Sequence, residues 1–395
     1  MIQETKSTIT WRIIARWFVG LVFLFSSFTK GVDPLGTAFK IEEYMTSWSF
    51  FGMSFTGLTP LAPFLSMSLI TAEFLVGVLL LTGAFRKLTS WLLLLMMTFF
   101  TFTTLYDAIS NKVSDCGCFG DFLKLSNWQT FWKNVVLDVP TVYIFLTRRW
   151  PRRKRLERDL LISLAAIAAM VIFGLYNINN EPVLDFRSWK VGNRMIDNIE
   201  EGLPVINIAT YSNSQSGEVK TFDMSEWKQY EYILTDTTGT WHCDTIVTKD
   251  PYDVHADGFM VQDRDGNDMT FDLIAATHEP VLICTVHHID KINDKGVKAI
   301  ADAKQYADEK GFRFAFLAFA PDGENGDDTR EATVLQFLYG NKLMPVEYYF
   351  GDEKAIETMV RSNPGFVLMH NATVQGKWHY RNVGKIKDFP IEKID

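Results

Sequence analysis

The chain has 395 residues and a formal net charge of −8, which leaves room for two or three domains. The charge is divided unevenly. Residues 1–176 carry 17 Lys and Arg against 11 Asp and Glu, whereas residues 177–395 carry 22 against 36. The acidic second half is typical of a water-soluble domain and argues against nucleic acid as a partner.

Five apolar segments in the first half are long enough to cross a bilayer, which takes about 20 mostly apolar residues each. The first is not typical of a cleavable signal peptide, because its apolar run is long and no good cleavage site follows it. The sequence therefore predicts an α-helical transmembrane bundle. The five segments are approximately 11–30, 62–84, 88–108, 128–147 and 159–176.

Basic residues predict how these segments cross the membrane. Seven Lys and Arg residues lie between positions 148 and 158, and clusters of this kind remain in the cytoplasm. The basic residues before the first segment, and those between the second and third, agree with this placement. We therefore expect a cytoplasmic N-terminus, with the 31–61 loop, the 109–127 loop and everything after 177 outside.

Several polar residues lie within the predicted spans or at their outer edge, where lipid would penalise them. Groups at such depth usually face the interior of a bundle and pair with one another. They form either a structural ion-pair cluster that fixes helix packing, or a proton path or polar rim around a quinone-like cofactor. The set comprises Lys30, Glu73, Asp107, Lys133, Asn134 and Asp138.

The 109–127 loop contains Cys116 and Cys118, two of the four cysteines in the chain, on either side of Gly117. Two cysteines that flank a glycine can close a small disulfide ring, and a strained, exposed bridge is usually labile or catalytic. Zinc normally takes four ligands, and no histidine or further cysteine lies in this loop. Redox chemistry is the leading interpretation, with a passive disulfide or a metal site as alternatives.

After Asn177 the pattern changes to short strands and turns. Residues 183–255 form a mixed segment with strand-like runs at 204–210 and 229–235. From residue 257 strands alternate with helices, which predicts a small α/β layer domain. We expect strands at 281–286, 312–319, 346–350, 363–369 and near 377–381, and helices at 293–310, 328–340 and 353–360.

The first half resembles the DoxX/MauE group of small membrane proteins over roughly residues 11–147. Members similar to MauE are linked to disulfide formation in exported proteins and are four-helix bundles reminiscent of quinone-coupled disulfide enzymes. The resemblance implies that Cys116 and Cys118 are the redox pair. It also implies an exported client or a partner membrane protein. The matching features are Lys30 with Asp33-Pro34, Glu73 with Gly77, and Cys116-Gly117-Cys118-Phe119-Gly120 followed by Trp128 and Asn134.

Residues from about 257 to 385 resemble a thioredoxin-like domain of the peroxiredoxin or membrane-anchored type. The order of elements fits, and Pro364 precedes an apolar strand where that fold places its cis-proline. The Cys-x-x-Cys of such a domain would fall at about His288–Lys291, and no cysteine is present there. The domain thus resembles a redox fold without its redox centre.

The remaining cysteines and histidines carry weaker signals. Cys284 lies within an apolar strand and is expected to be buried and inert. Cys243 is isolated; the alternatives are that it pairs with Cys284 or that either cysteine receives a disulfide from the Cys116/Cys118 loop. We interpret His287 and His288 as surface or core residues rather than metal ligands, because adjacent histidines after a strand are more often surface or core residues.

These features predict four parts. A DoxX/MauE-like four-helix membrane domain covers 1–150, and a basic cytoplasmic loop with a fifth transmembrane helix covers 151–180. A mixed connecting segment outside the membrane covers 181–256, and a thioredoxin-like domain without Cys-x-x-Cys covers 257–395. The location implied is a bacterial inner membrane, with the C-terminal domain periplasmic.

The leading functional hypothesis is a membrane thiol–disulfide redox protein that uses Cys116 and Cys118 on the periplasmic side, with quinone as a candidate electron acceptor. One alternative is a non-enzymatic, membrane-anchored assembly or binding protein, in which the bundle is an anchor. Another is a bundle that binds a lipid or quinone without thiol chemistry, which the buried Glu73 and Asp138 would permit.

Overall fold

The computed structural model describes most of the chain, which divides into two compact units, Met1–Arg187 and Ser188–Asp395. Each unit has a hydrophobic core of its own. The described residues are 6–47, 49–50, 53–54, 56–110, 119–123, 125–148, 156–196, 206–236, 238–249, 256, 259–321 and 329–390.

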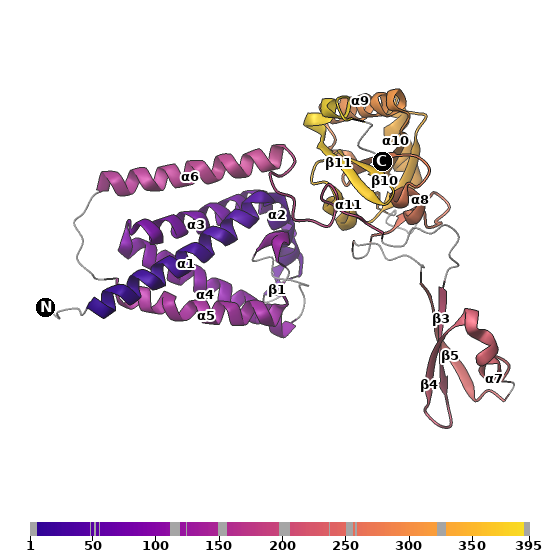
Figure 1. Cartoon of the computed structure of the whole chain (residues 1–395), viewed down its shortest axis with the longest axis horizontal. Helices are drawn as coiled ribbons and strands as arrows, with labels where there is room; N and C mark the ends of the chain where they lie inside the picture. Colours follow the sequence, from indigo (N-terminus) through magenta and orange to yellow (C-terminus); the bar gives the residue numbers. More distant parts are fainter. Residues whose placement is uncertain are drawn as a thin grey trace. The chain divides into compact units, whose positions relative to one another are not determined.

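The first unit consists mainly of long helices that lie side by side (Figure 1). Its core is formed by apolar side chains of α1, α3, α4 and α5, while many large apolar side chains remain exposed on the outside. In chain order, the elements are α1 (Lys6–Val32), α2 (Pro34–Ser47), β1 (Ser49–Phe50), β2 (Met53–Ser54), η1 (Thr56–Leu61), α3 (Ala62–Thr82), α4 (Arg86–Ser110), η2 (Gly120–Phe122), α5 (Asn127–Leu146) and α6 (Leu156–Asn179).

Local signals in the sequence explain where these helices begin and end. The helix α3 ends at Gly83, whose φ of 66° is left-handed and favours glycine. The helix α5 begins with a capping box. Ser126 Oγ accepts a hydrogen bond from the Gln129 backbone N–H at 3.3 Å, and Gln129 Oε1 accepts one from the Ser126 N–H at 3.0 Å, which satisfies two backbone donors at the helix start.

In the part of the chain that the structure describes, four helical segments are long and apolar enough to cross a membrane, and they fit a helical membrane bundle: Ile9–Val32, Thr56–Thr82, Arg86–Ser110 and Leu156–Asn179. Four of the five predicted apolar segments correspond to them, and the segment predicted at 62–84 extends two residues past Thr82. The fifth, at 128–147, also forms a helix, α5, but α5 is not among the four. Its polar residues, which include Lys133 and Asp138, reduce its mean hydropathy.

The second unit contains a six-stranded sheet in the order β11-β10-β7-β8-β9-β6. The central strands β7, β8 and β9 are parallel, while β10, β11 and β6 pair antiparallel to their neighbours. The strands are β6 (Val261–Gln262), β7 (Val281–Val286), β8 (Arg313–Ala318), β9 (Glu347–Gly351), β10 (Gly365–His370) and β11 (Thr373–His379). The helices between them are α8 (Thr270–Ala275), η4 (Ile289–Lys291), α9 (Asp294–Lys310), α10 (Arg330–Gly340) and α11 (Glu353–Met359), and η5 (Tyr380–Ile386) follows.

These elements confirm the alternation of strands and helices predicted after residue 257. The sheet is buried on both faces. Successive side chains of a strand point to opposite sides, and helices cover each side. Leu282, Cys284 and Val286 of β7 pack with α9 and α10, whereas Val281 and Ile283 pack with α8 and α11. The peptide bond between Asn363 and Pro364 is cis.

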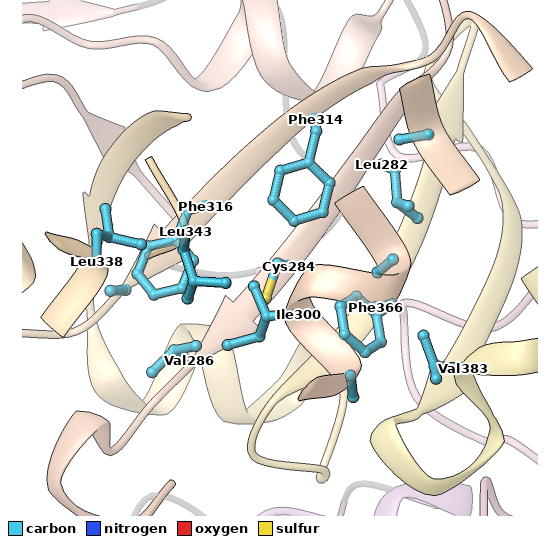
Figure 2. Packing of buried hydrophobic residues seen from close by; sticks show 14 of the residues in the cluster. Leu282, Cys284, Val286, Ile300, Phe314, Phe316, Leu338, Leu343, Phe366 and Val383 are labelled. Carbon is cyan, nitrogen blue, oxygen red and sulfur yellow. The ribbon is translucent and has the colours of Figure 1, made fainter. Parts of the chain in front are cut away.

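Cys284 lies inside the first of these two cores, among Val286, Ile300 and Phe316 (Figure 2). Its side chain is fully buried, and burial raises the pKa of the thiol well above its usual value. The prediction that Cys284 is buried is therefore confirmed. Cys243 is exposed, and neither of these two cysteines forms a disulfide.

A separate three-stranded antiparallel sheet has the order β4-β3-β5, with β3 (Ile206–Asn213), β4 (Val219–Asp223) and β5 (Trp241–Lys249). The strand predicted at 204–210 is present as β3. The strand predicted at 229–235 is wrong, because η3 (Met224–Gln229) and α7 (Glu231–Leu234) occupy that stretch. Tyr230 and Ile233 are spaced as on one face of a helix, and both pack into the small core of this sheet.

Candidate functional site

An ion pair between Lys30 and Glu73 lies inside the helical unit. Lys30 Nζ is 2.6 Å from Glu73 Oε1, and only 8% and 2% of the two side chains are exposed. Lys30 comes from the last turn of α1, and Glu73 from the middle of α3. Ser26 Oγ donates a hydrogen bond to the other carboxylate oxygen of Glu73 at 3.1 Å, so both oxygens of the buried carboxylate have a partner.

Asp107 is fully buried near the C-terminal end of α4. Its Oδ2 accepts a hydrogen bond from the hydroxyl of Tyr44 at 2.8 Å. Tyr44 belongs to α2, so this contact ties α2 to α4. Tyr44 is not among the polar residues predicted from the sequence, because a tyrosine outside the apolar spans carries no energetic penalty that would mark it.

The remaining predicted polar residues belong to α5. Asn134 donates from Nδ2 to Thr104 Oγ1 at 3.1 Å and to the Phe100 carbonyl at 3.3 Å. The Phe100 ring lies 5.7 Å from Lys30 Nζ, so Phe100 contacts both Asn134 and Lys30. Asp138 accepts a hydrogen bond from Thr101 Oγ1 at 2.8 Å.

The two threonines that hold Asn134 and Asp138 were also missed in the sequence. Thr101, Thr104 and Asp107 follow one another at intervals of three residues along α4, and this spacing places them near one another on the helix surface. That repeat of short polar side chains, ending in an aspartate, is the sequence pattern that could have indicated the contacts of Thr101 and Thr104 with α5.

The chain directly after the Cys-Gly-Cys motif contacts this polar region. Lys133 Nζ lies 4.6 Å from the centre of the Phe119 ring, within the range of a cation–π interaction. The same ring lies 5.6 Å from that of Phe25 on α1. A Cβ on Gly120 would lie 3.4 Å from the carbonyl oxygen of Thr29, so Gly120 approaches the backbone of α1 beside Lys30.

The predicted redox residues themselves, Cys116 and Cys118, lie outside the described residues. Of the six supporting residues, the structure brings Lys30 and Glu73 into direct contact, and Phe100 contacts both Lys30 and Asn134. Asp107, Lys133 and Asp138 each have a separate partner among the described contacts.

The opposite end of the helical unit is basic. Arg12, Arg16, Arg86 and Arg148 line one pocket, together with Gly83 and Thr147. The guanidinium of Arg16 donates from Nε to the Leu80 carbonyl at 3.0 Å. Arg16 and Lys30 are 14 positions apart on one helix, which separates them by about 21 Å. Lys30 and Arg16 therefore lie towards opposite ends of α1.

In the second unit, His287 and His288 directly follow β7, where the resemblance to a thioredoxin-like domain would place a Cys-x-x-Cys. Asn363, beside the cis-proline, accepts hydrogen bonds from the backbone N–H groups of both histidines at 3.2 and 3.4 Å. Burial lowers the pKa of His287 to about 3, so its imidazole is neutral at physiological pH.

Residues 8–147 match the family described as methylamine utilisation protein MauE. The N-terminal region is MauE-like. The match extends from α1 to α5 and includes Cys116, Cys118 and all six supporting polar residues. Together with the four apolar helices, it makes the chain a multi-pass membrane protein. No curated protein and no solved structure matches the chain.

Proposed function

We propose that the MauE-like region is a membrane thiol–disulfide oxidoreductase whose redox pair is Cys116 and Cys118. The observation that carries this proposal is the position of Phe119 and Gly120, the two residues that directly follow Cys118. Phe119 contacts Lys133, and Gly120 approaches the backbone of α1 beside Lys30. These two contacts support a position of the motif near the polar end of the bundle.

The reaction that fits is disulfide donation to an exported protein. A client thiolate attacks the Cys116–Cys118 disulfide and forms a mixed disulfide, while one cysteine of the pair leaves as a thiolate. A second client thiolate then attacks the mixed disulfide. The client gains a disulfide, and the pair is left as a dithiol.

Return of the pair to the disulfide releases two electrons and two protons. A membrane quinone is the class of acceptor that takes both. The polar end of the bundle supports this choice, because it holds the buried ammonium group of Lys30, which has three protons to donate to acceptors such as a quinone carbonyl oxygen. Glu73 and Asp107 are buried carboxylates, and intramembrane carboxylates commonly serve as proton relays.

The distribution of charge supports an orientation with the arginine group in the cytoplasm. The polar cluster and Phe119 would then lie towards the periplasm, where the compartment permits disulfides. With α5 counted as a fourth crossing and α6 as a fifth, the second unit would also be periplasmic.

The second unit would recognise clients rather than oxidise them. Its mixed sheet, with cis-Pro364 before β10, supports a thioredoxin-like fold. Cys284, the cysteine nearest to the usual redox position, is fully buried. This arrangement also favours the second candidate function, a non-enzymatic assembly or binding protein that the helical unit anchors in the membrane.

Redox titration of the full-length protein in detergent distinguishes the two functions. The protein is equilibrated with glutathione buffers of stepped potential, quenched with a maleimide and digested, and each cysteine is scored by mass spectrometry. The oxidoreductase requires Cys116 and Cys118 to switch together within the range of known disulfide donors and carriers, about −120 to −270 mV. An alkylation state that stays constant over this range would contradict it.

The matched control is Cys243→Ser, which removes an exposed thiol outside the MauE-like region and should leave the titration unchanged. Cys116→Ser and Cys118→Ser should each abolish oxidation of a reduced model peptide. If the peptide is oxidised at the same rate by both variants, the anchoring function is the better explanation.

A further inference from the structure

Four side chains with metal-binding groups converge at the end of β7. The rings of His287 and His288 lie side by side, with their centres 5.2 Å apart and their planes inclined at 60°. His287 Nδ1 is 3.8 Å from Glu357 Oε1, and His288 Nε2 is 3.4 Å from Glu353 Oε1. Glu353 and Glu357 are one helical turn apart on α11, so a single short helix supplies both carboxylates.

The backbone is held in the conformation that turns both rings towards α11. Successive side chains of a strand point to opposite faces, and two adjacent histidines in a regular strand would therefore diverge. Here Asn363 accepts hydrogen bonds from both histidine N–H groups and donates from Nδ2 to the His288 carbonyl at 2.6 Å. One side chain thus fixes the chain at the point where the strand ends.

The imidazole of His287 is buried without a hydrogen bond. Only 8% of its side chain is exposed, and neither ring nitrogen has a hydrogen-bond partner in the described part of the chain. The backbone of Arg361 faces the ring but forms no hydrogen bond of normal geometry with it. Buried polar groups are nearly always satisfied, and an exception calls for an explanation such as a bound ion.

The carboxylate of Glu357 is also buried, with 2% of its side chain exposed. Lys354 Nζ lies 3.1 Å from Oε2, and this lysine is 61% exposed. The other oxygen, Oε1, faces His287. The neighbouring cations are Lys354, Arg361 and Lys291. A cation bound between Glu357 and the histidines must therefore gain enough free energy from direct coordination to overcome the repulsion from these three positively charged side chains.

We propose that His287, His288 and Glu357 bind a divalent transition-metal ion of the Zn²⁺ type, with Glu353 as the fourth ligand. Imidazole nitrogen with carboxylate oxygen is a ligand set that such ions prefer. The ligand atoms of the first three residues all lie within 4.8 Å of one another. Zinc binds these atoms at about 2.0–2.2 Å, so side-chain rotations of His288, Glu353 and Glu357 would be needed to complete the coordination.

The proposal does not depend on the redox function of the MauE-like region, since it concerns a different unit of the chain. It gives a physical reason for the histidine pair at the place where a thioredoxin-like domain would carry its cysteines. In this chain, the same end of the central strand would hold a metal ion in place of a thiol pair.

Zinc binding to the full-length protein in detergent tests the proposal. The protein carries an affinity tag without histidine, and Cys116, Cys118 and Cys243 are replaced by serine so that no accessible thiolate competes. Equilibrium dialysis against ZnCl₂, with elemental analysis, should give one zinc ion per chain. Cobalt chloride should give the visible absorption of Co²⁺ with nitrogen and oxygen ligands, without a thiolate charge-transfer band.

Variants then assign the ligands. Glu357→Gln and His288→Ala should each weaken zinc binding by about 10-fold or more, the loss seen even for residues that only support a metal ligand. His278→Ala is the matched control, because His278 is exposed and outside the cluster, and it should bind zinc like the parent. His288 lies at the rim, with 29% of its side chain exposed, so its variant is informative even where Glu357→Gln fails to fold.

The proposal is overturned if the parent binds no zinc at about 100 μM, a concentration that corresponds to weak affinity. It is equally overturned if His288→Ala, shown by circular dichroism to be folded, binds zinc as tightly as the parent. Neither outcome would affect the redox titration of Cys116 and Cys118, so the two proposals fail separately.

Discussion

Lys30 Nζ and Glu73 Oε1 lie 2.6 Å apart in the interior of the helical unit, and almost none of either side chain is exposed. Removing one member of a buried ion pair leaves an uncompensated charge, which typically costs about 3–5 kcal/mol. Replacing both members by apolar residues of similar volume is often neutral. The pair therefore makes a clear prediction about variants at these two positions.

We expect Lys30→Met to destabilise the bundle by about 3–5 kcal/mol and Lys30→Met/Glu73→Leu to recover most of that loss. Thermal unfolding of the full-length protein in micelles measures the difference. Ser26→Ala, which removes a hydrogen bond to Glu73 without removing a charge, is the control and should cost about 1 kcal/mol. A double variant as unstable as the single one would show that the helices require the ion pair itself.

Gly120 gives a prediction about the tether after the Cys-Gly-Cys motif. Its φ is 54°, and a Cβ would lie 3.4 Å from the Thr29 carbonyl oxygen. Gly120→Ala should cost about 1–2 kcal/mol for the left-handed conformation. Because Gly120 is two residues from Cys118, the variant should also shift the midpoint potential of Cys116 and Cys118.

The control for this prediction is Gly57→Ala, since nothing lies within 4 Å of a Cβ at Gly57. The redox titration described above, carried out on both glycine variants, provides the measurement. Identical titration curves for Gly120→Ala and the parent would mean that the position of Phe119 and Gly120 has no bearing on the redox pair.

The apolar spans could be predicted because about 20 consecutive apolar residues have few alternatives to a membrane helix. A charge inside such a span must find a partner, which is why Lys30 and Glu73 could be singled out. Which partner each charge finds could not be predicted. Asp138 accepts a hydrogen bond from Thr101, and although the three-residue repeat of Thr101, Thr104 and Asp107 indicates a polar face of α4, it does not say which residue each of them contacts.

The histidine–glutamate cluster could not be predicted for a related reason. His287 and Glu357 are 70 positions apart and meet only because the sheet brings β7 beside α11. From the sequence alone, two adjacent histidines after a strand have no visible third ligand.

The wrong prediction of a strand at 229–235 has a local cause, since a short apolar run suits a strand or one turn of helix equally.

His379 gives a prediction about pH. Burial, and secondly the charge of Arg381, lower its pKa from 6.5 to about 4, and its Nδ1 accepts a hydrogen bond from the Arg381 backbone N–H at 3.1 Å. Between these two values the unfolded chain binds a proton that the folded chain excludes. The stability of the second unit should therefore be complete above pH 6.5 and fall as the pH is lowered towards 4.

The loss attributable to His379 is at most about 3 kcal/mol. Unfolding temperatures of the full-length protein near pH 7 and near pH 5 measure it. The variant His379→Gln, which keeps a hydrogen-bond acceptor without a titrating ring, should lose less stability over this interval than the parent. Equal losses in the two proteins would assign the pH dependence to other groups.

The two free cysteines of the second unit should differ sharply in reactivity. Cys243 is exposed, whereas Cys284 is fully buried and has a raised thiol pKa, and only the thiolate reacts with a maleimide. In a Cys116→Ser/Cys118→Ser background, native labelling should modify Cys243 at least about 10-fold faster than Cys284. Denaturant should remove the difference, because unfolding exposes both thiols. Rapid native labelling of Cys284 would contradict the packing of β7 against α9 and would show that this side of the sheet opens in solution.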